Sequence, residues 1–574
     1  MDDHKTSLDN DVGNRELSAS LAAARTKTDA SARVRPTENR PAANGRTGPV
    51  DDTASAIDRP QFLIRFNSIL FLEPAGRPAA EQSQPDCFGD LNLDQIVTAV
   101  TAGREEYDLK PFFHAALTDC DAIVYRQEIM RDVEDNSVRQ AIGSFATEMR
   151  AMREIFEEIA KLHFDLQKQA LLLDAINVCC QSTAELASAL ERLSPKSRGL
   201  HGFCAWLRSY VDSPRFETLA ATARDLRADL SAVRYSVLIN GSKVTVRNFK
   251  GETDYSADIE DVFGKFSQAA PKDYRHELRD SSWMNHVEAK ILELVAVLNP
   301  ALFGRLGQFC AAEDGQFVDP AVSTFDREIQ FYLSYLAYIS PLREDGLPFS
   351  YPVMSATSKE MTALGCFDLA LAGKLNREGQ RVVTNDLMLT GNERILVVSG
   401  PNQGGKTTFA RTFGQLAHLA RLGCPIPGRD TRLFLPDRIF THFERQEDSR
   451  NLRGKLQDDL VRIHDILAAA TPRSVIVMNE IFTSTTLRDA TFLSGKVLEH
   501  ILKLDALCVW VTFIHELSTH SDRTVSMVST IEPGDQAIRT YKVVRQPASG
   551  RSYAFSIAEK YGLTVERLKE RIGR

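Results

Sequence analysis

A glycine-rich loop between an apolar run and a helical segment constrains this chain more than any other feature. The loop matches the pattern G-x-x-x-x-G-K-[ST] over Gly400, Pro401, Asn402, Gln403, Gly404, Gly405, Lys406, Thr407 and Thr408. Residues 394–398 before it are typical of a buried strand, and residues 408–417 after it have the apolar spacing of a helix. Such glycines let backbone N–H groups approach phosphate oxygens, and a helix N-terminus favours negative charge. The sequence therefore predicts a phosphate-binding loop and a nucleoside triphosphate site.

Four side chains have predicted roles in that site. Lys406 would reach the β- and γ-phosphates, and the Thr407 hydroxyl would ligate Mg²⁺. A second apolar strand, residues 474–480, ends in Asn479 and Glu480, where phosphate-loop ATPases place an Asp that orders Mg²⁺ and a Glu that polarises water. Asn479 brings no charge to the metal, and a charge-assisted bond is worth roughly 1.5–3 kcal/mol against about 1 kcal/mol for a neutral one. We therefore expect ATP and Mg²⁺ as cofactors, Lys406 and Glu480 as catalytic residues, Thr407 and Asn479 at the metal, and slow turnover.

Composition indicates a soluble protein of several domains. The chain has 574 residues, 43% hydrophobic and 25% charged, which is too long for a single core. The formal net charge of −8 argues against a surface that is basic throughout. Nine scattered cysteines without a C-x-x-C pair favour a reducing compartment and no zinc site. The N-terminus lacks the apolar core of a secretory signal, and the longest apolar run, residues 506–514, is too short for a bilayer. We expect a cytoplasmic protein with no membrane segment.

The pattern along the chain divides it into four parts. Residues 1–60 have almost no aromatic side chains and predict a disordered tail, and residues 61–85 predict a short N-terminal β segment. Residues 86–345 have helical periodicity, interrupted at about 234–250 by two β-branched runs around Asn240-Gly241, the strongest short-range signal for a hairpin. From about residue 346 to 574, strands alternate with helices, which indicates an α/β nucleotide-binding domain.

Several motifs resemble the ATPase domain of the MutS family of DNA mismatch-repair proteins. They are residues 383–387, the Pro401-Asn402 pair of the loop, residues 437–441 with Glu447-Asp448, residues 551–554 and residues 557–563. Upstream, residues 125–128 look like part of the family's core and lever helices. The resemblance implies a multidomain fold: a long-helix core and lever region with an inserted β-hairpin, followed by an ABC-type P-loop ATPase domain. It also implies a homodimer with ATP at a composite site and C-terminal dimerisation helices at about 556–572, although that segment also fits a simple amphipathic terminal helix.

The sequence departs from the family pattern at three positions. Asn479 replaces an acidic residue, Gly454 stands where the signature helix usually begins with serine, and Phe513 stands where a switch histidine is expected. The Gly454 N–H with Lys455 could serve the partner's nucleotide, and His515 could replace the histidine, although a lone histidine at such a position more often has a structural role. The resemblance with these departures implies ATP binding with slow or conditional hydrolysis.

Two classes of function remain open. The first is a dimeric clamp on double-stranded DNA in repair or recombination, in which Lys243, Arg247 and Lys250 of the hairpin contact phosphates without recognising bases. Few residues precede the helical region, so no mismatch-reading domain is expected. The second is a nucleotide-dependent assembly or regulatory protein that no longer binds DNA, with those three residues as solvated charge. The Gly-Pro-Asn loop and the long helices count against a small-molecule kinase or a transport ATPase.

Overall fold

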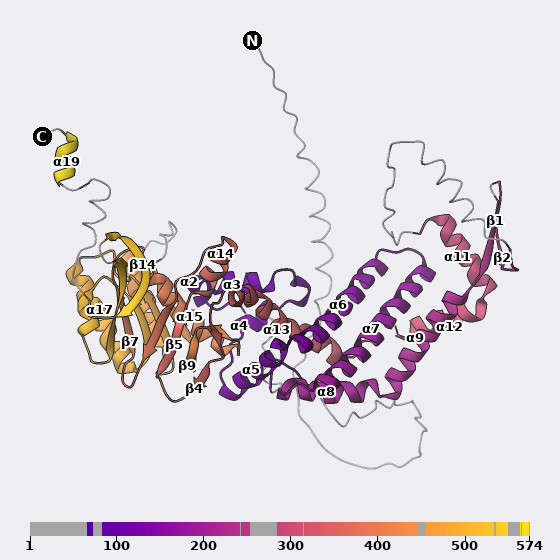
Figure 1. The fold of residues 1–574 in the computed structure, drawn as a ribbon, viewed down its shortest axis with the longest axis horizontal. Coiled ribbons are helices and arrows are strands. Elements are labelled where there is room, and N and C mark those ends of the chain that lie inside the picture. The colour runs from indigo at the N-terminus through magenta and orange to yellow at the C-terminus, as the bar shows by residue number, and fades with distance from the viewer. Residues whose placement is uncertain are drawn as a thin grey trace, which may run out of the picture. The chain divides into compact units, whose positions relative to one another are not determined.

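The structure, a computed structural model, describes nine stretches of the chain. They are residues 66–72, 83–241, 243–252, 284–313, 315–444, 454–532, 535–548, 563 and 565–572. The described elements belong to one compact unit that spans Phe62–Arg574 (Figure 1). The expected tail at 1–60 and the motifs at 447–448 and 551–562 lie outside the described residues.

Residues 66–72 differ from the expected β segment, because they form no strand. Helical side chains bond to their backbone instead of a neighbouring strand. The Tyr125 hydroxyl donates to Ser68 O at 2.7 Å, and the Glu328 carboxylate accepts from Ile69 N at 2.8 Å. The apolar run was therefore a buried segment between helices, which the sequence pattern does not distinguish from a strand.

The helical region consists of short helices followed by long ones. The short elements are α2 (Cys87–Leu91), α3 (Leu93–Thr101), η2 (Glu105–Tyr107) and α4 (Lys110–His114). The long ones are α5 (Cys120–Glu134), α6 (Asn136–Ile159), α7 (Asp165–Leu193), α8 (Arg198–Val211), α9 (Pro214–Ala232) and α13 (Pro320–Glu344). Side-chain oxygens cap five of the N-termini, from Asp119, Asp135, Ser197, Ser213 and Asp319. Helices α6, α7 and α9 run side by side (Figure 1).

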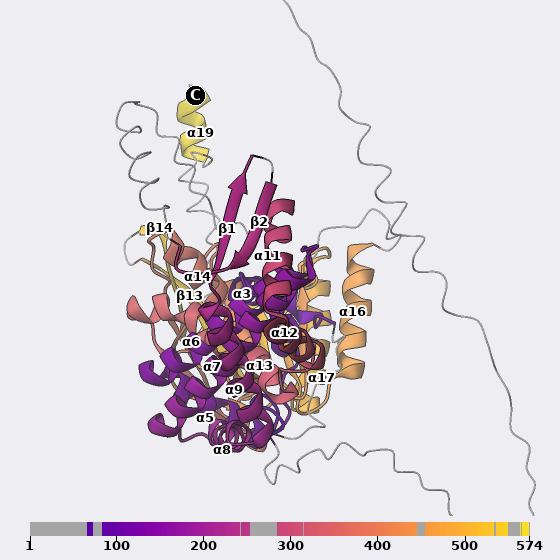
Figure 2. The same ribbon diagram turned by 90° about the vertical axis from the view of Figure 1, so that its right-hand side faces the viewer.

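A β-hairpin follows α9. Strand β1 (Tyr235–Asn240) pairs antiparallel with β2 (Lys243–Asn248), and Asn240 lies opposite Lys243. Gly241 has a φ of +59°, which the turn requires. Helix α11 (His286–Leu298) packs against β2 and leads into α12 (Pro300–Glu313), which packs on α7 and α9 (Figure 2). The hairpin is thus supported on one side by a helix.

The C-terminal region is built on a six-stranded sheet in the order β10-β11-β12-β7-β13-β14. Strands β10 to β12, β7 and β13 are parallel, and β14 is antiparallel. Their bounds are β7 (Ile395–Ser399), β10 (Ile439–Phe443), β11 (Val475–Asn479), β12 (Leu507–Val511), β13 (Thr524–Glu532) and β14 (Asp535–Arg545). Helix α15 (Lys406–Arg421) packs on one face of the sheet together with α2, and α16 (Lys455–Ala469), α17 (Leu487–Leu504) and η3 (His515–Thr519) cover the opposite face.

Smaller sheets join the sheet to the helical region. A four-stranded sheet has the order β4-β9-β5-β6, and β3 pairs with β8. Their bounds are β3 (Phe349–Ser350), β4 (Val353–Ser355), β5 (Met361–Cys366), β6 (Asn385–Leu389), β8 (Ile426–Pro427) and β9 (Arg429–Phe434), with α14 (Leu369–Arg377) after β5. A terminal helix, α19 (Val565–Ile572), ends the described chain.

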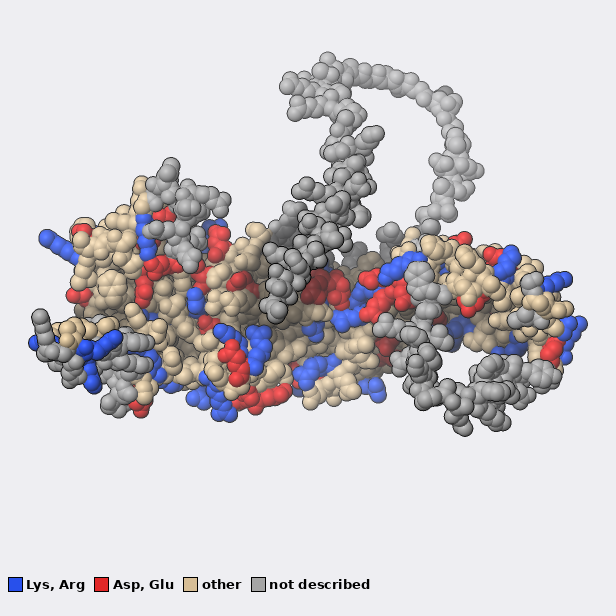
Figure 3. Space-filling view, turned by 90° about the horizontal axis from the view of Figure 1, so that it is seen from above, with Lys and Arg blue, Asp and Glu red and all other residues tan. Residues whose placement is uncertain are grey.

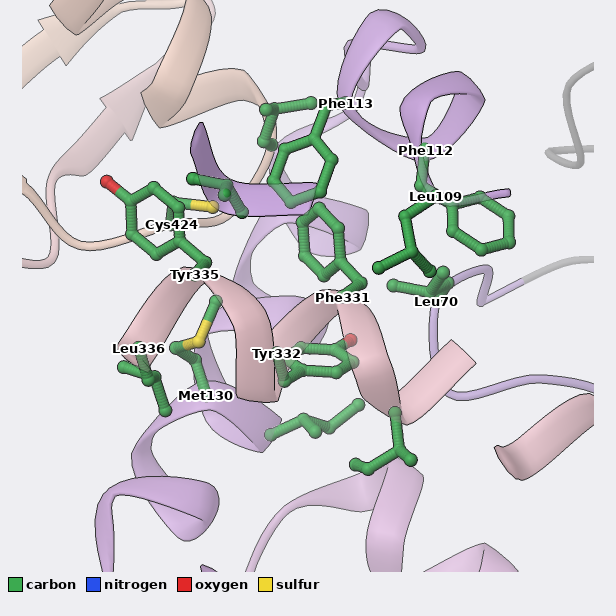
Figure 4. Packing of buried hydrophobic residues seen from close by; sticks show 14 of the residues in the cluster. Leu70, Leu109, Phe112, Phe113, Met130, Phe331, Tyr332, Tyr335, Leu336 and Cys424 are labelled. Carbon is green, nitrogen blue, oxygen red and sulfur yellow. The ribbon is translucent and has the colours of Figure 1, made fainter. Parts of the chain in front are cut away.

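The central strands are buried on both faces, as expected for a parallel sheet covered on two sides. Alternate residues of each strand enter different cores: Leu396 and Val398 belong to a large cluster with α15, whereas Ile395 and Val397 face a smaller cluster with α17. The large cluster continues into the helical region. There Phe331, Tyr332 and Tyr335 of α13 meet the residues labelled in Figure 4, among them Phe113, Met130 and Cys424.

Candidate functional site

The glycine loop links the end of β7 to the start of α15 and has a tightly wound backbone. Gly400, Gln403 and Gly405 have positive φ angles of 121°, 60° and 87°. A Cβ at Gly404 would lie 2.2 Å from the Ser529 hydroxyl oxygen, and one at Gly400 would lie 2.7 Å from Ser529 O. The Ser529 hydroxyl donates to Gly404 O at 2.6 Å. Strand β13 therefore holds the loop so closely that only glycine fits at these positions.

Lys406 points its ammonium group into the loop. The Nζ atom donates to Gly400 O at 3.0 Å, to Pro401 O at 3.1 Å and to Asn402 Oδ1 at 3.2 Å. Burial lowers the pKa of Lys406, and the Glu480 carboxylate, 3.8 Å away, acts in the opposite direction. A cation enclosed by acceptors in a loop of backbone N–H groups is arranged to bind an anionic group.

Asn479, the last residue of β11, and Glu480, which follows it, lie beside Thr407 and Lys406. Because β11, β12 and β7 are parallel, their carboxyl ends share one edge of the sheet. The Thr407 hydroxyl donates to Asn479 Oδ1 at 2.8 Å. Glu480 has a φ of +51°, and its N–H donates to Val511 O at 2.9 Å, which turns the chain away from the strand. Its carboxylate is one-third exposed and lies at the mouth of the loop.

The residues present fit Mg²⁺ only in company with a phosphate ligand. Thr407 and Asn479 offer two neutral oxygens, whereas Mg²⁺ usually takes one or two carboxylates with substrate phosphates. Among the described residues there is no group of three or more His, Cys, Asp or Glu side chains placed to hold a metal ion. The charge that retains the metal would therefore come from the nucleotide.

An open pocket of ≈ 380 Å³ surrounds the loop. Besides the loop residues 402–408 and Glu480, its lining includes Leu371 of α14 and Tyr541 of β14, neither of which the sequence analysis identified. Tyr541 is half exposed and adjoins Gly405, where a Cβ would lie 3.6 Å from Tyr541 O. Arg539, on the same strand, donates from Nε to Asn402 O at 3.2 Å. The order of the strands in the sheet places β14 beside the loop, and the local sequence does not predict that order.

Gly454, Lys455 and His515 lie elsewhere in this chain. Gly454 precedes α16 in an extended conformation without a side-chain cap, and Lys455 is bonded to Glu444. His515 begins η3. None of the three lines the pocket. The structure therefore brings together Lys406, Thr407, Asn479 and Glu480 but does not add these three to them.

The basic residues of the hairpin are exposed. Lys243 and Arg247 lie on one face of β2 because they are separated by four positions. Glu252 Oε1 lies 3.2 Å from Arg247 Nη2, and the Glu252 carboxylate also accepts from Lys250 N at 2.7 Å. Figure 3 shows Lys and Arg interspersed with Asp and Glu over the described surface in that view. The basic residues thus form a small local group with an acidic neighbour.

Residues 396–570 match the family model MutS domain V. The chain is 32% identical over 187 residues to the DNA mismatch repair protein MutS of Shouchella clausii, which covers 32% of this chain and 21% of that protein. It is 29% identical over 195 residues to the DNA mismatch repair protein MutS 2 of Halobacterium salinarum (33% and 23%), and 29% over 194 residues to MutS of Rickettsia bellii (33% and 22%). The matches thus span less than a quarter of each relative. Separately, no described helix is long and apolar enough to cross a membrane.

Proposed function

We propose that this chain, whose residues 396–570 match MutS domain V, is a MutS-like ATPase that works as a dimeric clamp on double-stranded DNA. The observation that carries the proposal is that Lys406, Thr407 and Glu480 line one pocket, with Asn479 bonded to Thr407. These residues lie at the carboxyl edge of a parallel sheet, where α/β proteins bind ligands.

The geometry supports a division of labour in ATP hydrolysis. Lys406 and the loop N–H groups hold the β- and γ-phosphates, while Tyr541 and Leu371 stand beside the pocket as a surface for the nucleoside. Thr407 and Asn479 would hold Mg²⁺, which when bound neutralises charge on the phosphate oxygens. Glu480 orients a water molecule toward the γ-phosphorus, and ADP leaves as the leaving group. The neutral Asn479 supports slow turnover.

Dimerisation would complete the site. Gly454 and Lys455 lie outside the pocket of their own chain, and α16 begins there with its N–H groups uncapped by a side chain. In a composite site, the start of α16 from a second copy would face the γ-phosphate, as favoured by the helix dipole. His515 and the terminal helix α19 belong to the same proposal, as a switch and a dimer contact.

Nucleotide binding is tested first with Lys406→Ala. We expect this variant to lose binding of a fluorescent ATP analogue, because it removes the one cation of the loop. The matched control is Lys496→Ala, an exposed lysine of α17 paired with Glu499. Retained ATP affinity in Lys406→Ala would refute the assigned role of the loop.

DNA binding is tested with a salt series on duplex DNA. A linear fall of log affinity with log salt would support the clamp, and replacing Lys243 and Arg247 by Ala should reduce the slope by about 1 for each lost phosphate contact. Lys290→Ala on the neighbouring α11 is the control, since Lys290 is already paired with Glu293.

A second candidate function is nucleotide-dependent assembly or regulation without DNA. The contact of Glu252 with Arg247 and the net charge of −8 favour it, because both weaken attraction to phosphate. Absence of duplex binding at about 50 mM salt, with ATP binding intact, would select this alternative.

A further inference from the structure

One face of the phosphate-loop helix α15 is bonded to the main chain of residues 90–117. Four side chains at a spacing of four, three and three residues make these bonds, which places them in one stripe along the helix. Arg411 Nε donates to Asp90 O at 3.0 Å, Gln415 Nε2 to Leu91 O at 2.8 Å, His418 Nε2 to Phe113 O at 2.8 Å and Arg421 Nε to Leu117 O at 3.2 Å. The stripe therefore fastens the helix that carries Lys406 and Thr407 to α2, α4 and the turns beside them.

The packing beneath the stripe is equally close. A Cβ at Gly414 would lie 2.5 Å from Leu91 Cδ2, so the leucine side chain occupies the space that a larger residue would need. The Asp90 carboxylate accepts from the Thr441 hydroxyl of β10 at 2.7 Å. Residues 90 and 91 are thus fixed to the ATPase domain through their carbonyls, a side chain and a packing contact.

Gln415 joins three elements at once. Its Oε1 accepts from Leu369 N at 2.8 Å, and its Nε2 donates both to Leu91 O and to Asp368 Oδ1 at 2.8 Å. Asp368 Oδ1 in turn accepts from Leu371 N at 3.1 Å and caps α14. Gln415 is 1% exposed, so displacing any partner would leave a buried polar group without a bond. Leu371 lines the nucleotide pocket, which makes Gln415 the connection between that wall and residue 91.

The contacts around α15 extend to the long helices. Arg126 of α5 donates from Nη1 to Leu422 O, directly after α15, at 3.3 Å, and from Nε to Leu70 O at 2.8 Å. Gly423 packs against Arg126, since a Cβ there would lie 2.6 Å from Arg126 Cβ. Only Asp135 separates α5 from α6. The C-terminal end of α15 therefore contacts α5, which leads to the long helices.

We propose that Gln415 is a positioning residue that transmits occupancy of the nucleotide pocket from Leu371 and α15, through Leu91 O, to the block formed by residues 87–117 and α5. The inference rests on the proposed function and deepens it by naming how the nucleotide site is coupled to the helical arm, by which we mean α6 and the β1–β2 hairpin. Because the bonds are made to backbone carbonyls, the block follows α15 as a unit rather than by rearrangement of side chains.

Two variants distinguish the bonds of Gln415 to residues 368 and 369 from its bond to Leu91 O. Gln415→Met keeps the size of the side chain and removes all its hydrogen bonds. The double variant Gln415→Glu with Asp368→Asn lets the new amide donate to the new carboxylate, which also still accepts from Leu369 N. It restores the bond between residues 368 and 415 and leaves Leu91 O without a donor, while Leu371 N loses its acceptor because the amide nitrogen takes the place of Asp368 Oδ1. Gln181→Met, at an exposed position of α7, is the control.

The measurements are the affinity for a fluorescent ATP analogue and hydrogen exchange of residues 136–159 and 235–248 with and without nucleotide. In the unmodified protein we expect binding and a nucleotide-dependent change of exchange in the arm. Gln415→Met should bind at least about threefold more weakly and lose the arm response. The double variant should bind more tightly than Gln415→Met and still lack the response.

The results distinguish a failure of the proposed coupling from a failure of the proposed function. An arm response in the double variant equal to that of the unmodified protein would overturn the inference while leaving ATP binding established. Absence of nucleotide binding by the unmodified protein would instead overturn the proposed function, and the coupling with it. If Gln415→Met unfolds, Arg411→Met serves in its place, since it removes the bond to Asp90 O and the cation–π contact with Phe443 on a half-buried part of the stripe. Its arm response should fall at unchanged melting temperature, and an unchanged response would count against the coupling.

Discussion

The Thr407 hydroxyl lies 2.8 Å from Asn479 Oδ1 and donates a hydrogen bond to it. The two candidate metal ligands are therefore already in contact, one from the start of α15 and the other from the end of β11. Neither is charged, and the one carboxylate among the residues that line the pocket is that of Glu480, which lies 3.8 Å from Lys406 Nζ. In the proposed mechanism, the residues that would hold the nucleotide and the metal therefore differ from the residue that would activate water.

Restoring the acid at Asn479 should speed Mg²⁺-dependent hydrolysis. Asn479→Asp keeps the size of the side chain and the bond from Thr407 and adds a charge for the metal. The gain of a charge-assisted contact over a neutral one is about 1–2 kcal/mol, which corresponds to an increase in rate of about 5–30-fold at limiting Mg²⁺. The measurement is the ATP hydrolysis rate over a Mg²⁺ titration. An unchanged rate at every Mg²⁺ concentration would mean that the metal is held elsewhere.

Glu480→Gln should stop hydrolysis without weakening ATP binding. The amide keeps the shape of the side chain but cannot accept a proton from water, and a positioned base typically contributes about 10²–10⁴-fold to the rate. Affinity should be unchanged or slightly higher, because a negative charge near the phosphates and Lys406 is removed. Single-turnover hydrolysis and equilibrium binding measure the two effects separately. Hydrolysis at the unmodified rate would exclude Glu480 as the water-orienting residue.

Ser529→Ala should weaken nucleotide binding by loosening the loop. It removes the bond to Gly404 O, a buried contact worth about 1 kcal/mol, and we expect about a fivefold increase in the Kd for ATP at an unchanged rate of the bound state. Ser526→Ala is a matched control on the same strand, since the Ser526 hydroxyl has no hydrogen-bond partner among the described residues. Equal affinities in the two variants would contradict a positioning role for Ser529.

The sequence predicted features that depend on neighbouring residues. The strand, glycine loop and helix around Lys406 follow from local composition, as does the turn at Gly241, which has the positive φ that its hairpin needs. Features made by distant residues were missed. Ser529, Tyr541 and Gln415 matter because β13, β14 and residues 90–91 are brought beside the loop or its helix by tertiary packing.

The prediction of a strand was wrong at residues 66–72 for the same reason. Its apolar pattern fits a strand, but three successive carbonyls accept from side chains of two helices: Ser68 O from Tyr125, Ile69 O from Tyr332 and Leu70 O from Arg126. A backbone whose bonds are supplied by side chains needs no strand partner. Such partners are more than fifty residues away in sequence, where a window of local periodicity contains no information about them.

His418 makes the free energy of unfolding depend on pH. It is buried on α15, its Nε2–H donates to Phe113 O at 2.8 Å, and burial lowers its pKa to about 3, with Arg421 and His114 acting in the same direction. The unfolded chain takes up a proton on this side chain near pH 6.5. The contribution of neutral His418 is therefore complete above pH 6.5 and is lost as pH falls toward 3, by about 1.4 kcal/mol per pH unit.

His418→Gln should remove this dependence while keeping an N–H donor for Phe113 O. Urea titrations at pH 6.0, 5.0 and 4.5 give the free energy of unfolding, and the slope against pH should be shallower in the variant by one proton. His464→Gln is the control, because that side chain is 80% exposed on α16. If the unmodified protein and His418→Gln lose stability with the same slope, then His418 takes up a proton while the protein is folded. The bond to Phe113 O would in that case survive in the imidazolium form, because Nε2 carries a hydrogen in both states.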